Sequence, residues 1–328
     1  MKLLMVVHHR FDLWNAPTWF AERLRKEFPA LEIVHLARYE GAEEEICDSE
    51  VIFAFSLRPE QFKAAHKLRW IHAPTAAVHQ LLFPEMVKSD VVLTNAHEVH
   101  GPVVAEHVVA LIFALAKKIP QAALLQQRRT WGQDAIWNHG TRPREVAGAT
   151  LGLIGVGSIG RKVASMASAL GMRVIAVREH PEKKMPEGVA AVYAPAEIND
   201  LLAQSNYVVV AAPLTPATRG LMNADRLAAM RPDAYLINVG RGPQVDEIAL
   251  ADALRNRRIA GAALDVFEQE PLPASSSLWD LENLLITPHT AGLTEKLWER
   301  HYALFSENLR RYLAREPLLF IVDKQKGY

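Results

Sequence analysis

The sequence has a single cysteine, no excess of charge of either sign and no long hydrophobic run. Cys47 alone cannot form an intrachain disulfide framework, and such low cysteine content suits a reducing cytoplasm. Lys+Arg and Asp+Glu both number 37, so no net positive field attracts nucleic acid or an anionic membrane. No segment approaches the roughly 18 consecutive apolar residues of a membrane-spanning helix. We therefore expect a cytoplasmic protein with neither a nucleic-acid partner nor a membrane partner.

Signals for secretion and for metal binding are also missing. Residues 1–7 are too short for the apolar region of a signal peptide, and they are predicted to form a buried parallel strand. The 13 histidines include His97-x-x-His100, with His107 nearby, but no cysteine or carboxylate cluster completes a ligand set. We predict no metal site, because packed or solvated histidines explain this pattern more simply.

Apolar and amphipathic segments alternate along the chain. A length of 328 residues suits two domains, and a hydrophobic content of 50% is enough for two cores. Strand-like runs in the first hundred residues occur at 3–7, 31–36, 51–55, 69–72 and 91–94, with helical spacing at 18–27 and 59–65. A second series of strand-like runs occurs at 151–154, 174–177, 207–211, 235–238, 261–265 and 284–287. Each series predicts an α/β domain with a doubly wound parallel sheet.

The segments between and after these two series differ in character. Residues 101–120 predict one long helix that is apolar on most of its circumference, and that is therefore buried between domains or at a subunit interface. Residues 121–145 are polar and contain Trp131 and Trp137, so we expect an extended arm with aromatic anchors. The amphipathic segment 293–313 is long enough to return to the first domain.

The strongest motif is a glycine-rich loop between a predicted strand and a predicted helix. It reads Gly155-x-Gly157-x-x-Gly160, with Ser158 and Ile159 at the start of the helix. The first glycine permits a tight turn, the second lets the backbone approach a pyrophosphate, and the third lets the helix pack on the strand. The N–H groups and the positive end of the helix dipole would face that phosphate. The order strand, loop, helix, strand predicts a dinucleotide-binding unit.

The end of the next strand indicates which nicotinamide cofactor binds. An acidic residue there accepts hydrogen bonds from the ribose 2′-OH of NAD, whereas an arginine accommodates the 2′-phosphate of NADP. Arg178 stands at this point, and Lys183 and Lys184 follow shortly after it. These cations favour NADP. The alternative is NAD, with Glu179 holding the ribose hydroxyls.

Three ionisable residues follow the last three strands of the second series. Arg241, Glu270 and His289 each come shortly after the end of one of these strands. In an open parallel sheet, ligands bind at the carboxyl ends of the strands, near the point where the strand order reverses. We therefore expect the three side chains to converge on one cleft.

Several segments, in this order, make the sequence resemble the D-isomer-specific 2-hydroxyacid dehydrogenase family. They are Gly155-x-Gly157-x-x-Gly160, Pro213-Leu214-Thr215-Pro216-x-Thr218, Asn238-Val239-Gly240-Arg241-Gly242, Asp265-x5-Pro271-Leu272-Pro273 and Pro288-His289-Thr290-Ala291-Gly292. Thr94-Asn95 and Val104-Ala105-Glu106-His107 extend the similarity toward the N-terminus. The resemblance implies a flavodoxin-like substrate domain, a Rossmann dinucleotide-binding domain and a cleft between them. We assign residues 1–100 and 293–328 to the first domain and residues 101–292 to the second.

The resemblance implies a role for each member of the Arg–Glu–His set. Arg241 would bind the substrate carboxylate and polarise the 2-oxo group, which suits a planar, two-pronged cation better than lysine. His289 would protonate the new alkoxide, or accept the proton in the reverse reaction, and Glu270 would orient its ring and favour the imidazolium form. The implied reaction reduces a small 2-oxo acid, such as glyoxylate or hydroxypyruvate, to the D-2-hydroxy acid.

The resemblance also implies contacts with cofactor, substrate and a second subunit. Asp265 would accept a hydrogen bond from the nicotinamide carboxamide. The other cofactor contacts would come from the glycine loop with Ser158 and Ile159, and from Arg178, Pro213, Thr218, Val239, Gly240 and Gly292. The loop Thr75-Ala76-Ala77 would bind the substrate through backbone N–H groups, although the two alanines replace a usual glycine pair. Leu57, after a first-domain strand, is a further substrate candidate. A homodimer built around the arm is implied as well.

Two other functions fit the same scaffold. A formate-type dehydrogenase carries glutamine where Glu270 stands, because it has no alkoxide to protonate, so Glu270 argues against that reaction. A corepressor-like protein that senses NAD(H) can keep all three ionisable residues. It therefore remains the alternative to an enzyme.

Overall fold

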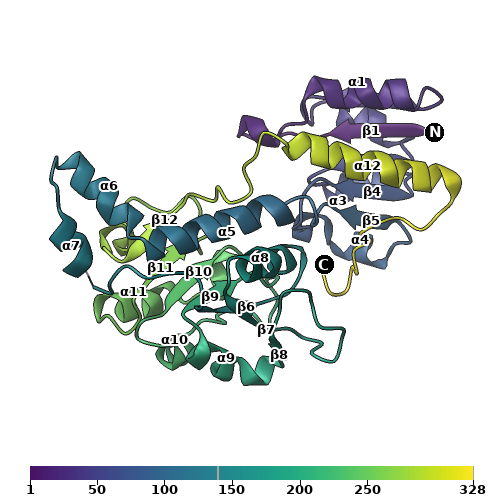
Figure 1. Ribbon diagram of the computed structural model, residues 1–328. Helices are drawn as coiled ribbons and strands as arrows, with labels where there is room; N and C mark the ends of the chain where they lie inside the picture. The colour runs from purple at the N-terminus through teal and green to yellow at the C-terminus, as the bar shows by residue number, and fades with distance from the viewer. Residues whose placement is uncertain (139, 328) are drawn as a thin grey trace. The chain divides into compact units, whose positions relative to one another are not determined.

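The computed structural model describes residues 1–138 and 140–327, which divide into two compact units (Figure 1). Unit 1 consists of Met1–His100 and the segment from Thr294 onward, and unit 2 consists of Gly101–Leu293. Each unit has one sheet in which every strand pair is parallel. The prediction of an α/β fold with two doubly wound parallel sheets is therefore confirmed.

The sheet of unit 1 has five strands in the order β2-β1-β3-β4-β5. The strands are β1 (Lys2–Val6), β2 (Glu32–Leu36), β3 (Val51–Ala54), β4 (Trp70–Ala73) and β5 (Val92–Asn95). The order reverses between β1 and β3, which is the flavodoxin-like arrangement. The strands β3 and β4 are buried along their whole length, because helices cover both faces of the sheet.

Two apolar clusters fill the space between the unit 1 sheet and its helices. The helices are α1 (Thr18–Glu27), α2 (Ala42–Ile46), α3 (Pro59–Ala64), α4 (Pro84–Lys88) and α12 (Leu297–Ala314), with 3₁₀ turns at Asp12–Trp14 and His79–Leu81. Leu297, Phe305 and Leu309 of α12 are buried in the same cluster as Phe20 of α1. The late segment therefore returns to the first sheet, as its amphipathic spacing predicts (Figure 1).

The sheet of unit 2 has seven strands in the order β12-β11-β10-β9-β6-β7-β8. They are β6 (Thr150–Ile154), β7 (Arg173–Val177), β8 (Ala191–Tyr193), β9 (Tyr207–Val210), β10 (Tyr235–Asn238), β11 (Gly261–Leu264) and β12 (Leu284–Ile286). The order reverses between β6 and β9, as in a Rossmann sheet with one added strand. The glycine-rich loop follows β6 and so lies at this reversal.

Helices pack on both faces of the unit 2 sheet (Figure 1). They are α5 (Gly101–Ala116) and α8 (Ser158–Ala169) on one face, and α9 (Ile198–Gln204), α10 (Ala224–Ala229) and α11 (Glu247–Arg255) on the other. Short 3₁₀ turns lie at Pro195–Glu197, Gly242–Gln244 and Ser277–Asp280. Val104 and Val108 of α5 share an apolar cluster with Val163 of α8, which explains why α5 is apolar around most of its circumference.

The expected single helix over residues 101–120 is wrong. The helix α5 ends at Ala116, and the backbone at Lys118 is left-handed with φ of 59°. The next helix, α6 (Ile119–Gln127), starts with Pro120 in its first turn, where proline is tolerated although a helix interior excludes it. Residues 121–145, expected to form an extended arm, contain most of α6 and all of α7 (Gln133–Asn138). These helices extend away from the sheet of unit 2 (Figure 1).

Within residues 1–138 and 140–327, no individual helix combines the length and the apolar composition needed to cross a bilayer. The helices α5 and α6 reach those values as a pair, with a bend of 66° between them.

Candidate active site

The loops after β10, β11 and β12 emerge side by side at the carboxyl edge of the unit 2 sheet, because these strands are adjacent and parallel. They carry Arg241, Glu270 and His289. A Cβ atom at Gly242 would overlap the carbonyl group of Phe267. A glycine is therefore required where the loop carrying Arg241 packs against the loop carrying Glu270.

A short hydrogen bond joins His289 to Glu270. The His289 Nδ1 atom lies 2.6 Å from Glu270 Oε2, and the other carboxylate oxygen accepts the Phe267 N–H at 2.9 Å. Both oxygens of the carboxylate are thus engaged, which fixes its orientation. The His289 side chain is 51% exposed, and Nε2 is the ring nitrogen left to exchange a proton with a ligand.

The backbone of His289 adopts a left-handed conformation, with φ of 53°. Its N–H donates to the carbonyl oxygens of Asp265 at 2.9 Å and Thr287 at 3.0 Å. A residue other than glycine in this region stores strain that the surrounding structure must support. Here the end of β11 supports it.

The Asp265 side chain fastens the loop after β12 to the end of β11. It is 1% exposed and accepts hydrogen bonds from Thr287 Oγ1 at 2.6 Å, from the Thr290 N–H at 2.8 Å and from the Ala291 N–H at 3.0 Å. Because a buried carboxylate needs several donors, this network fixes the position of the whole loop.

Two fully buried side-chain amides, those of Gln244 and Asn238, hold the Arg241 backbone in place. Gln244 Oε1 accepts the Arg241 N–H at 2.8 Å, and Asn238 Nδ2 donates to the Arg241 carbonyl at 3.1 Å. The half-buried guanidinium donates from Nη1 to the Gly240 carbonyl at 2.7 Å. Among the described residues, that is the one acceptor for its five N–H groups, so the others can bind a ligand.

Burial and neighbouring charges determine the protonation of this set. Burial lowers the pKa of the Arg241 guanidinium, and the Glu270 carboxylate partly opposes that effect. Burial alone would raise the pKa of Glu270, but the hydrogen bonds from His289 and the Phe267 N–H outweigh it and hold the pKa below its ordinary value. Glu270 is therefore an anion at neutral pH, beside a guanidinium that stays cationic.

The three glycines of the loop after β6 are required for three different reasons. Gly155 has φ of 99°, and a Cβ atom there would lie 2.8 Å from the backbone of Ala212. A Cβ atom at Gly160 would overlap the carbonyl oxygen of Gly155, so this glycine allows α8 to pack close to β6. A Cβ atom at Gly157 would meet nothing within 4 Å, so this glycine leaves an open face in front of the loop.

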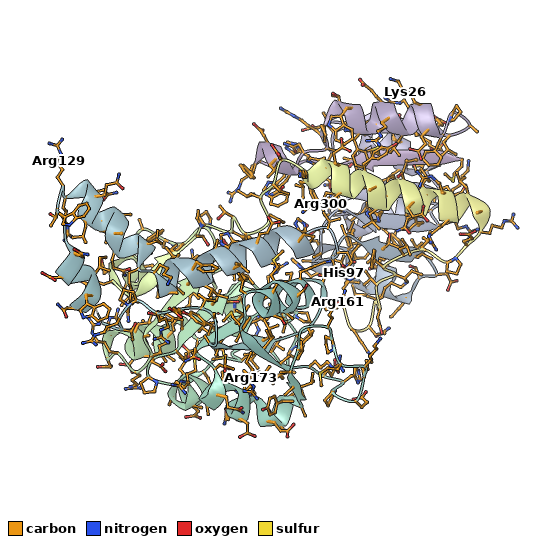
Figure 2. The ribbon with its side chains drawn as sticks, viewed as in Figure 1. Lys26, His97, Arg129, Arg161, Arg173 and Arg300 are labelled. Atoms are coloured by element: carbon orange, nitrogen blue, oxygen red, sulfur yellow. The ribbon has the colours of Figure 1, made fainter. Side chains whose placement is uncertain are left out.

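This open face fits the pyrophosphate of a dinucleotide. Gly157 is the N-cap of α8 and provides no capping side chain to the first turn, which begins with Ser158 and Ile159. A helix start of this kind directs N–H groups and positive dipole charge toward an anion. Arg161 adds an exposed cation near the same end of α8 (Figure 2).

The Arg178 side chain folds against the loop that follows β7. Its Nη2 donates to the carbonyl oxygens of Pro181 at 3.4 Å, Lys184 at 3.2 Å and Lys183. Its Nε is buried and has no acceptor among the described residues. The guanidinium is thus held at the end of β7 with donor capacity left for an anion.

The other residues expected to bind cofactor also lie at the carboxyl edge of unit 2. Thr218 Oγ1 donates to the Pro213 carbonyl at 2.7 Å, which closes the loop after β9. Val239 is buried in the apolar cluster beneath α5, and a Cβ atom at Gly240 would overlap the Gln244 side chain. Gly292 is half-buried after the loop carrying His289.

The expected substrate residues belong to unit 1. Thr75, Ala76 and Ala77 follow β4, and the Ala76 carbonyl accepts from Asn95 Nδ2 at 3.0 Å. Within residues 1–138 and 140–327, the Ala76 N–H has no acceptor and is therefore available to a carboxylate. Leu57 is 4% exposed and packs in a core cluster of unit 1.

Gln244, Thr287 and His107 also take part in the contacts at this edge, although no sequence motif gives them a role. Thr287 was detectable as the polar end of an apolar strand, whereas nothing in the sequence separates Gln244 from an exposed glutamine. His107 was interpreted as a packed histidine, yet its Nε2 lies 3.2 Å from Thr287 Oγ1. In the part of the chain that the structure describes, no three His, Cys, Asp or Glu side chains could hold a metal ion.

Comparison with known proteins matches residues 109–291 to the family described as D-isomer specific 2-hydroxyacid dehydrogenase, NAD binding domain. Glyoxylate reductase from Thermofilum pendens is 34% identical, over 81% of this chain and 78% of that protein. A D-isomer specific 2-hydroxyacid dehydrogenase from Xanthobacter autotrophicus, solved with NADPH and MES, has a TM-score of 0.82 and 32% identity, covering 100% and 99% of the two chains. An NADPH-dependent glyoxylate/hydroxypyruvate reductase from Sinorhizobium meliloti, solved with NADP and sulfate, has a TM-score of 0.83 and 25% identity over both whole chains.

The family match covers more than half of the chain and includes the glycine loop and all three ionisable residues at the carboxyl edge. The fold, the site and the relatives agree: this chain belongs to the D-isomer specific 2-hydroxyacid dehydrogenase family, and its second unit carries the NAD-binding domain.

Proposed function

We propose that this protein reduces a small 2-oxo acid, such as glyoxylate or hydroxypyruvate, to the D-2-hydroxy acid, with NADPH preferred over NADH. The observation that carries the proposal is the 2.6 Å contact between His289 and Glu270 beside a half-buried Arg241. An acid, the carboxylate that orients it and a cation lie together at the carboxyl edge of a dinucleotide-binding sheet. The relatives named glyoxylate reductase support the choice of substrate class.

The three side chains would divide the work on the substrate. The Arg241 guanidinium would bind the carboxylate of the 2-oxo acid and polarise its carbonyl group, since partial burial strengthens such charge-assisted hydrogen bonds. His289 would donate a proton from Nε2 to the carbonyl oxygen. Glu270 would hold Nδ1 and stabilise the imidazolium that donates this proton. When bound, the nicotinamide supplies the hydride.

The residues that would hold the cofactor surround the reversal of the unit 2 sheet. The glycine loop with Ser158 and Ile159 would bind the pyrophosphate, and Arg178 with Lys183 and Lys184 would bind the 2′-phosphate of NADP. The remaining contacts would come from Pro213, Thr218, Val239, Gly240, Asp265 and Gly292. The bound NADPH or NADP of two solved relatives supports this preference.

Steady-state kinetics tests the proposal. Glyoxylate, hydroxypyruvate, pyruvate and phenylpyruvate would each be combined with NADH and with NADPH, and oxidation followed at the nicotinamide absorbance. We expect turnover of glyoxylate or hydroxypyruvate, with a higher kcat/KM for NADPH than for NADH. A preference for NADH would instead assign ribose recognition to Glu179. Cofactor binding without turnover on any substrate would contradict the proposed reduction.

The substitution His289→Asn tests the assigned acid. Loss of a general acid lowers rates by about 10²–10⁴, so kcat is expected to fall by this factor while the cofactor Kd stays nearly constant. His66→Asn is a matched control, because His66 is exposed in unit 1. Unchanged turnover in His289→Asn would remove His289 from its role.

A further inference from the structure

His107 is an ionisable side chain of unit 2 that the proposed reaction does not use. It lies on α5, its side chain is 21% exposed, and its Nε2 approaches the end of β11. That atom lies 3.2 Å from Thr287 Oγ1 and 3.7 Å from Asp265 Oδ1. This imidazole therefore meets polar groups of Thr287 and Asp265, although the cluster that α5 joins is apolar.

The directions of the hydrogen bonds determine where His107 carries a hydrogen atom. The Thr287 hydroxyl has a single hydrogen, and it donates this hydrogen to Asp265 Oδ1 at 2.6 Å, because an ionised carboxylate can only accept. Thr287 Oγ1 must then accept from His107 Nε2. An ordered chain of donors runs from His107 through Thr287 to Asp265.

Asp265 connects this chain to the active-site loop. Its carboxylate also accepts the N–H groups of Thr290 and Ala291, which follow His289 directly. Its main-chain carbonyl accepts the His289 N–H at 2.9 Å. A change in the charge around Asp265 therefore occurs beside His289, the proposed acid, and beside the expected nicotinamide site.

Few charged groups face His107. Burial lowers its pKa below the ordinary value, and Asp265 opposes that effect only in part, so the ring is neutral at neutral pH. On α8, which packs against α5, Arg161 and Lys162 are exposed, whereas the residues in the shared cluster are apolar. The β10 and β11 residues in that cluster are apolar as well. Asp265 is the one described group whose charge acts on His107.

We propose that neutral His107 is a positioning residue. It leaves the negative charge of Asp265 without a neighbouring positive charge, so that Asp265 can attract the oxidised nicotinamide ring. When His107 is protonated, binding of the oxidised cofactor weakens more than binding of the reduced cofactor. The reason is that the oxidised ring carries a positive charge and the reduced ring does not. A carboxylate beside the ring attracts only the charged form, and an imidazolium 3.7 Å from that carboxylate cancels the attraction. This inference rests on the proposed function, in which Asp265 contacts the nicotinamide.

The ratio of two dissociation constants tests this role without any turnover. The Kd values of NADP⁺ and NADPH would be measured by titration calorimetry between pH 8 and pH 5. The ratio of the oxidised to the reduced value is expected to rise by about tenfold toward acid pH, which is the effect of one unit of coupled pKa. In His107→Gln, the amide can still donate to Thr287 but cannot take up a proton. This variant should bind both NADP⁺ and NADPH at pH 8. Its ratio of Kd values should increase much less toward acid pH than the wild-type ratio.

Controls separate this inference from the proposed function. In His66→Gln, a substitution in unit 1, the ratio of Kd values should increase toward acid pH as much as in wild type. Thermal unfolding at pH 8 would verify that His107→Gln is folded. The wild-type protein gives a second measurement, since linkage requires NADP⁺ binding near pH 6 to release more protons than NADPH binding. Equal pH dependence in wild type and His107→Gln, or equal proton release for the two cofactors, would overturn the role of His107. Failure of the wild type to bind either cofactor would overturn the proposed function itself.

Discussion

Both oxygens of the Glu270 carboxylate are engaged, one by His289 and one by the Phe267 N–H. The carboxylate cannot rotate away from the imidazole without losing its bond to the backbone. Because its folded-state pKa is held below the ordinary value of 4.5, the contact is fully present above that pH. It is lost only as the pH falls through the lowered value, so Glu270 can assist His289 throughout the neutral range.

Replacing Glu270 by glutamine removes the charge and keeps the shape. An adjacent carboxylate favours the imidazolium form, so without it His289 holds the transferable proton only in more acidic solution. We expect the alkaline limb of kcat/KM for reduction to move to lower pH by about one unit, the size typical of a neighbouring charge. The measurement is the pH profile of the purified variant.

Glu268→Gln provides the matched comparison. Glu268 is exposed in the same loop, and its backbone N–H, not its carboxylate, bonds Glu247 at 2.7 Å. Its profile should coincide with that of wild type. If the limb of Glu270→Gln stays in place as well, the 2.6 Å contact has no effect on proton transfer.

The residues of the site differ in how far the sequence reveals them. Arg241, Glu270 and His289 follow successive strands of one parallel sheet, so topology alone predicts their convergence, and the structure places them on adjacent loops. The burial of Leu57 depends on packing between distant segments, which no local pattern encodes. The Arg178 side chain turns toward the carbonyl groups after β7 because of the path of that loop. The sequence does not predict this path either.

At the scale of elements, the junction of β6 with α8 allows its glycines to be separated by function. In Gly157→Ala the added methyl meets no atom within 4 Å, so stability should be unchanged. The methyl would occupy the space proposed for the pyrophosphate, and the cofactor Kd should rise about tenfold, or about 1.4 kcal/mol. Thermal unfolding and cofactor titration measure the two effects independently.

Gly160→Ala should behave in the opposite way. Its methyl would overlap the Gly155 carbonyl oxygen, and such overpacking costs about 1–3 kcal/mol of the free energy of unfolding. A destabilised Gly157→Ala with normal cofactor affinity would show that the open face of the loop is not the pyrophosphate site.

Element boundaries were predictable where periodicity was strong. The helix over residues 18–27 has the predicted bounds, and the strands expected in both sheets differ from the observed ones by a residue or two. The strand β8 has three residues, too few to show any period, and it was missed. The break between α5 and α6 was missed because the apolar pattern runs on past it, although Pro120 was a local signal.

At the scale of the whole molecule, α6 and α7 form an exposed projection from unit 2. Neither helix has a buried residue, and Trp131 between them is 94% exposed (Figure 1; Arg129, at the outer end of α6, is labelled in Figure 2). Leu124 and Trp137 are also exposed, so this projection presents apolar surface to solvent in a single chain. We propose that a second copy of the chain covers it in a homodimer.

The substitution Trp131→Ser tests the homodimer. A central aromatic contact in an interface is worth about 2 kcal/mol or more, so dissociation should become detectable by sedimentation equilibrium at micromolar concentration. Ile321→Ser, which removes an exposed apolar side chain from unit 1, should leave the association unchanged. A wild-type protein that sediments as a monomer would refute the proposal.

Unit 1 is built from two stretches of chain that are separated by all of unit 2. Residues Leu297, Phe305 and Leu309 of α12 complete the apolar cluster that covers Leu3 and Phe53 of the first sheet. On the ribosome, Gly101–Leu293 emerges before α12, so α1 alone covers that face of the sheet, and part of the face stays exposed, until α12 is made. The nascent first hundred residues are thus the part of the chain that chaperones must shield from aggregation until translation has passed α12.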